Sequence, residues 1–202
     1  MQWLLDSVGP NERWCLVHAT HMDATETEGL ALSKAVAGLC PTTEGDLGDG
    51  FFNAKPFLEH SGRFGIGGDS HVGIDPFAEL RVFEYGQRLA HQRRNVLGLA
   101  PMESFGGWLY RAACGGGAQA LAQPIGSLAP CHRADWIVLD ENDVAIAEQR
   151  GDALLDSAIF GPTRLPLRDV MVGGQWKVRD GMHGRATQTF ARYRATLKRL
   201  LA

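Results

Sequence analysis

Residues 14–21 of the chain read WCLVHATH, a short apolar run that is followed at once by two histidines, His18 and His21. An apolar run of this length fits a buried strand and is too short for a helix. Two similar runs follow at residues 39–40 and 64–67, and the second of these also ends in polar residues. The sequence therefore predicts three short buried strands in its first third.

Helices are expected between and after these strands. Thr25 and Glu28 have the spacing of a capping box and predict a helix that runs to about Ala37, where Gly38 ends it. A glycine-rich loop is expected after the second strand, over residues 42–50. Three further helices are predicted, over residues 56–61, 76–90 and 102–113.

This alternation of short strands and helices predicts an α/β fold with three βα units. Such units form a parallel sheet with helices outside it. In a (β/α)8 barrel the active site lies at the edge where the strands end, and the polar residues gather at that edge here. An open doubly wound sheet is the alternative, but it predicts a G-x-G-x-x-G motif after the first strand, and none follows Val17.

The second half of the chain has a different pattern, which predicts a small β-rich unit. Residues 135–140 are predicted as a strand. Residues 170–172 and 175–178 are predicted as a hairpin, because Gly173 and Gly174 between them suit a tight two-residue turn.

An amphipathic helix is predicted at the end of the chain, over residues 187–201. Pro124 and Gly126 interrupt the pattern that precedes the β-rich unit. We therefore divide the chain into a first domain of residues 1–124 and a second domain of residues 125–202.

The composition is that of a globular protein. The chain has 202 residues, of which 45% are hydrophobic and 21% are charged, and its net charge is −3. Without a basic stripe, nucleic-acid binding is not expected. No apolar stretch is long enough to span a membrane. The four cysteines form no C-x-x-C pair, which favours reduced cysteines in a cytoplasmic protein over a zinc cluster.

Two strand ends carry candidates for hydrolytic chemistry, His18 after the first strand and Asp69 after the third. A carboxylate can bind a metal ion, take a proton from the attacking water and later return it. Asp69 could instead only cap the helix that follows, but Ser70 and His71 add two polar groups that a cap does not need. Both interpretations remain open from these residues alone.

Five segments resemble the amidohydrolase superfamily, in the same order and with similar spacing. They are LVHATHMD (16–23), LCPTTEGDLGDG (39–50), GIGGDSHV (65–72), IGSLAPCHRADWIVLD (125–140) and VGGQWKVRDG (172–181). The first three are similar to strands 6, 7 and 8 of the superfamily's barrel, and the last two to its small β domain. The resemblance implies the last three βα units of a partial (β/α)8 (TIM) barrel, part of a small β domain and a C-terminal helix.

Within the superfamily, the second segment is similar to the C-P-T-T-E-x-x-L-G-D-G of the formimidoylglutamate deiminases, where many other members carry C-P-x-S-N. This resemblance implies a zinc-dependent enzyme of histidine degradation that hydrolyses N-formimino-L-glutamate to N-formyl-L-glutamate and ammonia. It also implies a small-molecule substrate and a homodimer.

The resemblance assigns roles to the residues at the strand ends. Asp69 is implied as metal ligand and proton carrier, and His18 and His21 as catalytic residues. The residues implied to contact the substrate are Thr42, Thr43, Ser70 and His71. Glu44 is expected to point away from the substrate and to bind backbone amides of residues 45–50.

The superfamily holds its zinc with three histidines and one aspartate, and Asp69 is the one ligand with a counterpart here. The others belong to strands 1 and 5, which precede the matched segments. A catalytic zinc has at least three protein ligands. We therefore expect the remaining ligands in an amino-terminal part of the protein, and the chain alone to be inactive. The alternatives are a purine deaminase or triazine chlorohydrolase of the same superfamily, and a truncated fragment without activity.

Overall fold

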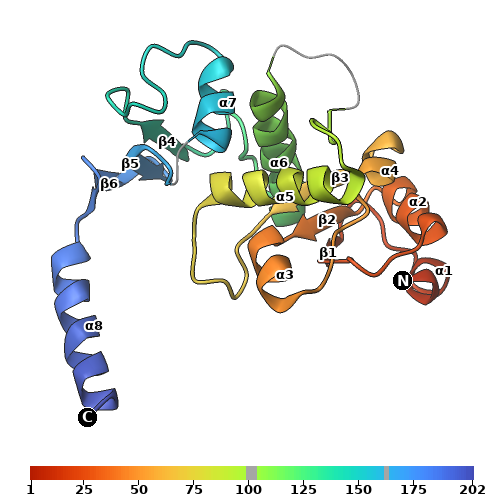
Figure 1. Cartoon of the computed structure of the whole chain (residues 1–202), viewed down its shortest axis with the longest axis horizontal. Helices are drawn as coiled ribbons and strands as arrows, with labels where there is room; N and C mark the ends of the chain where they lie inside the picture. Colours follow the sequence, from red (N-terminus) through yellow and green to blue (C-terminus); the bar gives the residue numbers. More distant parts are fainter. Residues whose placement is uncertain (99–103, 162–163) are drawn as a thin grey trace.

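A computed structural model of the chain describes residues 1–98, 104–161 and 164–202 (Figure 1). A short helix, α1 (Gln2–Ser7), comes before the first strand. None of the helices in the described ranges is long and apolar enough to cross a membrane.

The first sheet has three parallel strands in chain order, which are β1 (Cys15–Val17), β2 (Val36–Leu39) and β3 (Arg63–Ile66). Val36 of β2 lies between Cys15 of β1 and Arg63 of β3. The central strand β2 is buried, whereas β1 and β3 form the two edges of the sheet. The predicted parallel sheet of three βα units is confirmed.

The second strand begins earlier in the chain than predicted. Helix α2 (Ala24–Leu32) ends well before Ala37, and its capping box is formed by Asp23 and Glu26, not by Thr25 and Glu28. Alanine and glycine around Val36 favour helix or loop by local propensity. Ala35, Val36 and Ala37 are nevertheless fully buried, and Val36 and Ala37 pair with strands on both sides, so this segment forms a strand.

The predicted glycine-rich loop over residues 42–50 is wrong in its first half, which is helical. Helix α3 (Pro41–Leu47) starts with a proline in its first turn and ends at Gly48, whose φ of 72° is left-handed. Proline suits the start of a helix, and a left-handed glycine suits its end. Gly45 therefore lies inside a short helix, where it costs some stability but does not break it.

Three further helices complete this half of the chain, namely α4 (Ala54–Glu59), α5 (Pro76–His91) and α6 (Phe105–Leu121). Of the predicted helix over residues 102–113, Met102 lies outside the described residues. Helix α6 continues beyond Ala113 through three glycines. A Cβ atom added to Gly116 would lie 1.8 Å from the carbonyl oxygen of Phe64. Gly116 therefore lets α6 lie directly against the backbone of β3.

The core lies between this sheet and its helices. The largest fully buried side chains there include Phe57, Phe64, Phe77, Leu30, Leu39, Leu80 and Leu109. The rings of Phe64 and Phe83 lie 5.2 Å apart between β3 and α5. Burial of such aromatic side chains is the main stabilising contribution in this half of the molecule.

The second sheet is antiparallel, with strands β4 (Trp136–Leu139), β5 (Leu167–Val172), β6 (Gln175–Arg179) and β7 (Met182–His183) in that order. The hairpin between β5 and β6 is confirmed, and both of its turn glycines have positive φ angles, 58° at Gly173 and 75° at Gly174. Two positive φ angles match the twist of the flanking strands.

Helix α7 (Ala153–Phe160), which the sequence analysis missed, packs against α6. The rings of Phe105 and Phe160 stack at 5.8 Å, so residues on both sides of the proposed boundary near residue 124 are in contact. The boundary itself stays a prediction. The last helix, α8 (Ala186–Leu200), buries no residue and projects away from the rest of the molecule (Figure 1).

Candidate functional site

The predicted site residues lie at the carboxyl ends of β1, β2 and β3. Because these strands are parallel and adjacent, His18, residues 42–44 and Asp69 follow the three strands at one edge of the sheet. His18 Nε2 lies 3.9 Å from Asp69 Oδ2. The expected juxtaposition of His18 and Asp69 is therefore present, at a distance that suits a bridging water better than a direct hydrogen bond.

The backbone turns sharply at both of these residues. His18 has a φ of 65° and Asp69 a φ of 48°, and the amide of His18 donates a hydrogen bond of 2.8 Å to Gly38 O on β2. Left-handed backbone outside glycine is uncommon and often marks functional positions. Both side chains remain open to solvent, with 35% of the His18 side chain and 45% of the Asp69 side chain exposed.

Glu44 holds His18, a contact that the sequence analysis missed. Glu44 Oε1 lies 3.2 Å from His18 Nδ1 and accepts a 2.8 Å hydrogen bond from the amide of Cys40. The expectation that Glu44 would bind backbone amides of residues 45–50 is therefore wrong. The Glu44 side chain instead points back toward the start of α3. There it contacts the Cys40 amide and the His18 ring that follows β1.

Burial sets the electrostatics beneath the site. It raises the pKa of the Glu44 carboxyl, while the hydrogen bond from Cys40 and the neighbouring His18 act in the opposite direction. Burial also raises the pKa of the Cys40 thiol to about 11, helped by the nearby carboxylates of Glu44, Asp69 and Glu79. Cys40 is therefore a protonated thiol at neutral pH.

The two threonines of α3 already have protein partners. The Thr43 hydroxyl donates to Gly68 O at 2.8 Å and accepts a hydrogen bond from the His71 amide at 3.0 Å. The Thr42 hydroxyl donates to the buried carboxylate of Glu79, which also accepts from the Thr42 amide at 2.9 Å. The substrate contacts expected of these threonines stay predictions, and their observed role is to join α3 to α5 and to the turn after β3.

The remaining predicted residues lie around two shallow hollows. His21 is exposed and lines a hollow of about 350 Å³ together with His18 and Asp49. His71 and Asp69 line a neighbouring hollow of about 240 Å³. His71 Nδ1 accepts a 3.0 Å hydrogen bond from the Gly73 amide, and Ser70 is exposed. Contacts of His21, Ser70 and His71 with a substrate stay predictions.

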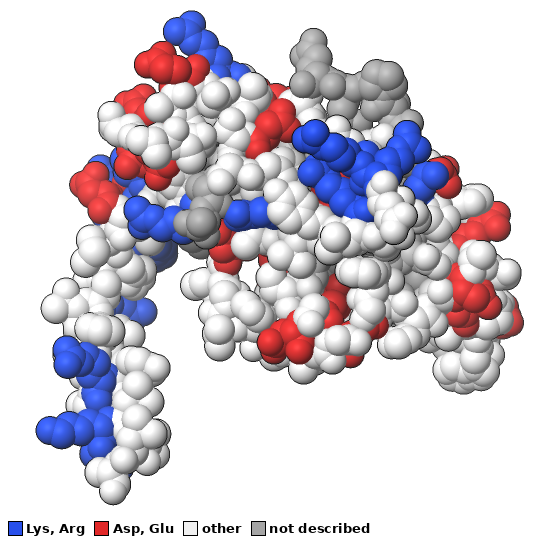
Figure 2. Space-filling view, viewed as in Figure 1, with Lys and Arg blue, Asp and Glu red and all other residues white. Residues whose placement is uncertain are grey.

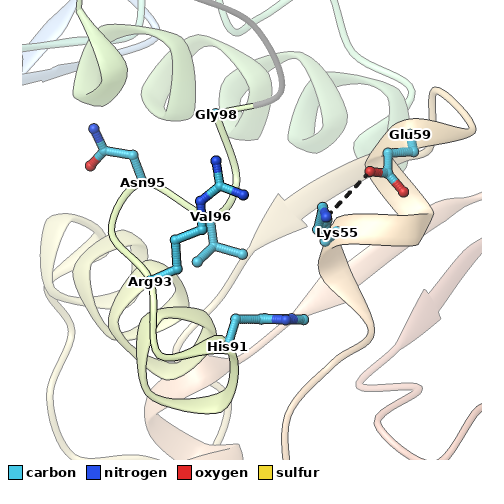
Figure 3. Close-up of a pocket in the computed structure, with 7 residues that line it drawn as sticks. All are labelled: Lys55, Glu59, His91, Arg93, Asn95, Val96 and Gly98. Carbon is cyan, nitrogen blue, oxygen red and sulfur yellow. Dashed lines mark ion pairs between the residues drawn. The ribbon is translucent and has the colours of Figure 1, made fainter.

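A third hollow lies between the end of α5 and helix α4. Figure 3 shows its lining side chains, among them Lys55, His91 and Arg93, around a space of about 310 Å³. None of the residues predicted for the site lines this hollow.

The side chains at the strand ends supply some of the ligands that a zinc ion needs. Asp69 offers a carboxylate and His18 an imidazole nitrogen on the same side of the sheet. Over residues 1–98, 104–161 and 164–202, no group of three histidine, cysteine, aspartate or glutamate side chains is placed to hold a metal. A catalytic zinc has at least three protein ligands. The described residues therefore fit one part of a zinc site.

Comparisons with known proteins agree with this arrangement. The chain is 54% identical over 183 residues to the formimidoylglutamate deiminase of Pseudomonas aeruginosa, which covers 91% of this chain and 40% of that protein. A crystal structure of an amidohydrolase from Brucella melitensis is 42% identical and has a TM-score of 0.89, covering 100% of this chain and 44% of that one. The chain thus spans less than half of the length of these relatives.

A more distant structure shares the fold alone. It is an adenosine deaminase from Xanthomonas campestris with bound zinc, with 23% identity and a TM-score of 0.73 over 94% of this chain and 43% of that one. The Amidohydrolase family matches residues 5–177, from before the first strand to the β5–β6 hairpin. With three parallel strands that are followed by His18, helix α3 and Asp69, and a family match over most of its length, the chain belongs to the amidohydrolase family.

Proposed function

We propose that this chain is the carboxyl-terminal part of a zinc-dependent deiminase that hydrolyses N-formimino-L-glutamate to N-formyl-L-glutamate and ammonia. Strands β1, β2 and β3 are then the last three strands of an eight-stranded barrel. The observation that carries the proposal is the approach of His18 Nε2 to Asp69 Oδ2, 3.9 Å apart, in a chain 54% identical to a formimidoylglutamate deiminase.

The reaction adds water to the formimino carbon and releases the terminal nitrogen as ammonia. The Asp69 carboxylate takes a proton from the attacking water and passes it to the departing nitrogen. His18 orients this water through Nε2 and stabilises the tetrahedral intermediate. Zinc, when bound with Asp69 as one ligand, lowers the pKa of the water and polarises the substrate.

The two substrate carboxylates need cationic partners. Arginine suits carboxylates because its guanidinium group binds them through two parallel hydrogen bonds. The carboxyl ends of β1, β2 and β3 are followed by His18, residues 41–44 and Gly67 to His71, which include no arginine. We therefore expect these arginines in the remaining part of the protein.

The test joins this chain to the amino-terminal part of the Pseudomonas aeruginosa deiminase, to give a protein that we call the chimera. We expect the chimera to bind stoichiometric zinc and to release ammonia from N-formimino-L-glutamate, and the 202-residue chain alone to do neither. The substrate panel also includes formiminoaspartate, guanine and a chlorotriazine. A higher kcat/KM for guanine or the triazine would overturn the deiminase proposal.

A further inference from the structure

We infer that Thr43 and Glu44 together position the two reacting groups, Glu44 by fixing the ring of His18 and Thr43 by fixing the turn that carries Asp69. The inference rests on the proposed function for its chemical meaning. Its evidence is geometric, because two consecutive residues of α3 contact the chain on either side of the site, at β1 and after β3.

Glu44 is placed to select one tautomer of His18. Its side chain is 6% exposed, and Oε1 lies 3.2 Å from His18 Nδ1. An ionised carboxylate can only accept hydrogen bonds, so a neutral His18 in this contact carries its proton on Nδ1. A hydrogen bond from one ring nitrogen to a carboxylate commonly fixes which nitrogen remains for chemistry.

The consequence for the other ring nitrogen is specific. With the proton on Nδ1, Nε2 is an acceptor, and it faces the carboxylate of Asp69 at 3.9 Å, which is also an acceptor. Two acceptors cannot bond to each other directly. They can share a donor between them, and a water molecule that donates to both Nε2 and Asp69 Oδ2 meets this need. By leaving Nε2 as an acceptor, the Glu44 contact creates a binding position for the attacking water between His18 and Asp69.

Thr43 acts on the other side of the site. Its hydroxyl bonds to Gly68 O, immediately before Asp69, and to the amide of His71, two residues after it. Thr43 is 1% exposed, so these bonds are shielded from water. Asp69 itself has a φ of 48°, and a left-handed aspartate is held best when the backbone on both sides is fixed.

Helix α3 is itself anchored. The buried carboxylate of Glu79 on α5 accepts from both the amide and the hydroxyl of Thr42. Such charge-assisted bonds to a helix start are strong. The residue just before Thr43 and Glu44 is therefore fixed to α5, which gives both side chains a rigid base.

The first test measures the tautomer of His18 from the ring 15N chemical shifts of the 202-residue chain at neutral pH. We expect the Nδ1–H form to dominate in the unchanged chain. Glu44→Gln keeps an oxygen but loses the charge, and Glu44→Met keeps the shape but loses both. We expect the fraction of Nδ1–H to fall in that order, by about tenfold in the Met variant, as loss of one charge-assisted bond predicts.

The matched control is the exposed pair of His60 and Glu28, whose atoms lie 3.7 Å apart. Glu28→Met should leave the His18 spectrum unchanged. Dominance of Nε2–H in the unchanged chain, or a Glu44→Met variant whose His18 spectrum equals that of the unchanged chain, would overturn the positioning role of Glu44.

The second test measures amide hydrogen exchange at His71. The His71 amide also bonds to Gly68 O at 3.1 Å. Thr43→Val, which removes the hydroxyl at nearly constant volume, should therefore speed exchange at His71 by about threefold, whereas Thr43→Ser retains the hydroxyl and should keep exchange slow. Exchange in the Val variant as slow as in the unchanged chain would overturn the role of Thr43. Neither readout needs turnover, so an inactive chimera would defeat the proposed function and leave this inference standing.

Discussion

The parallel sheet and the antiparallel sheet differ in how completely they are packed. In the parallel sheet, Val36 and Leu39 of the central strand are fully buried, and Leu39 shares its core with aromatic rings from α4 and α5. In the antiparallel sheet, Trp136 and Trp176 keep 36% and 41% of their surface exposed. The candidate site rests on the well-packed sheet, which suits chemistry that depends on atoms held within a fraction of an ångström.

Helix α8 is even less packed than the antiparallel sheet, because it buries no residue. Figure 2 shows its lysine and arginine side chains along one side and uncharged side chains along the other. Phe190 and Tyr193 on α8 are 60% and 58% exposed. The buried side chains of the parallel sheet thus stabilise the fold that carries the candidate site, whereas the apolar residues of α8 contribute little to the stability of this chain.

The largest effect is expected from Asp69→Asn in the chimera. Asparagine has no basic oxygen to take the proton of the attacking water, so we expect kcat to fall by about 10² to 10⁴. Ammonia release measures this loss. Asp46→Asn, at an exposed position of α3, is the matched control and should leave kcat unchanged. Retention of more than about a tenth of the rate by the Asp69 variant would remove Asp69 from the mechanism.

The packing contrast is tested by shortening one phenylalanine in each region. Phe64→Ala on β3 should lower the free energy of unfolding by about 3–5 kcal/mol, because its ring is buried against Phe83 and Trp108. Phe190→Ala on α8 should change it by less than about 0.5 kcal/mol. Urea unfolding of the 202-residue chain measures both values. Equal losses would show that α8 is packed in solution.

The two histidines after β1 should differ in their effect on turnover. His18 lies 3.9 Å from Asp69 and is held by Glu44, whereas His21 lies three residues further on and is exposed. We expect His18→Ala to lower kcat of the chimera by about 10² and His21→Ala by less than about tenfold. Parallel kinetics of the two variants check this, and the reverse order would exchange their roles.

The smallest effect is a pH dependence of stability at Glu44, where the facing groups are His18, Glu79 and Cys40. Burial raises the pKa of Glu44 in the folded chain, so ionisation costs more there than in the unfolded chain. Protonated Glu44 makes its full contribution to the free energy of unfolding below the pKa that Glu44 has in the unfolded chain. This contribution is lost as the pH rises through the pKa of Glu44 in the folded chain.

Glu44→Gln cannot ionise and escapes this loss. Its stability relative to the unchanged chain should therefore improve from acidic to neutral pH, as measured by urea unfolding over that range. A relative stability that worsens with rising pH would show that the bond to His18 outweighs burial.

Much of the fold and of the candidate site could be predicted from the sequence. Short apolar runs ending in His18 and Asp69 predicted parallel strand ends that meet, because parallel neighbours share an edge. Gly173 and Gly174 predicted the hairpin correctly, since positive φ angles favour glycine. These features depend on local chemistry and on simple strand geometry.

The features that could not be predicted from the sequence depend on contacts between distant segments. Val36 was assigned to a helix because only its neighbours in the sheet make it a strand. Helix α6 was ended too early because its glycines disfavour a helix locally, although Gly116 needs the space against Phe64. The Glu44 contact with His18 was missed because it depends on the direction of one side chain across two strands.

The two edges of the parallel sheet have a practical consequence. In the described part of the chain, neither β1 nor β3 pairs with a strand on its outer side, so each presents a row of unused amide and carbonyl groups. Such edges act as templates that add whatever extended segment reaches them first. In the chimera, the strands of the amino-terminal part must compete for these edges with other copies of the same chain. Concentration and order of mixing will therefore decide between assembly and aggregation.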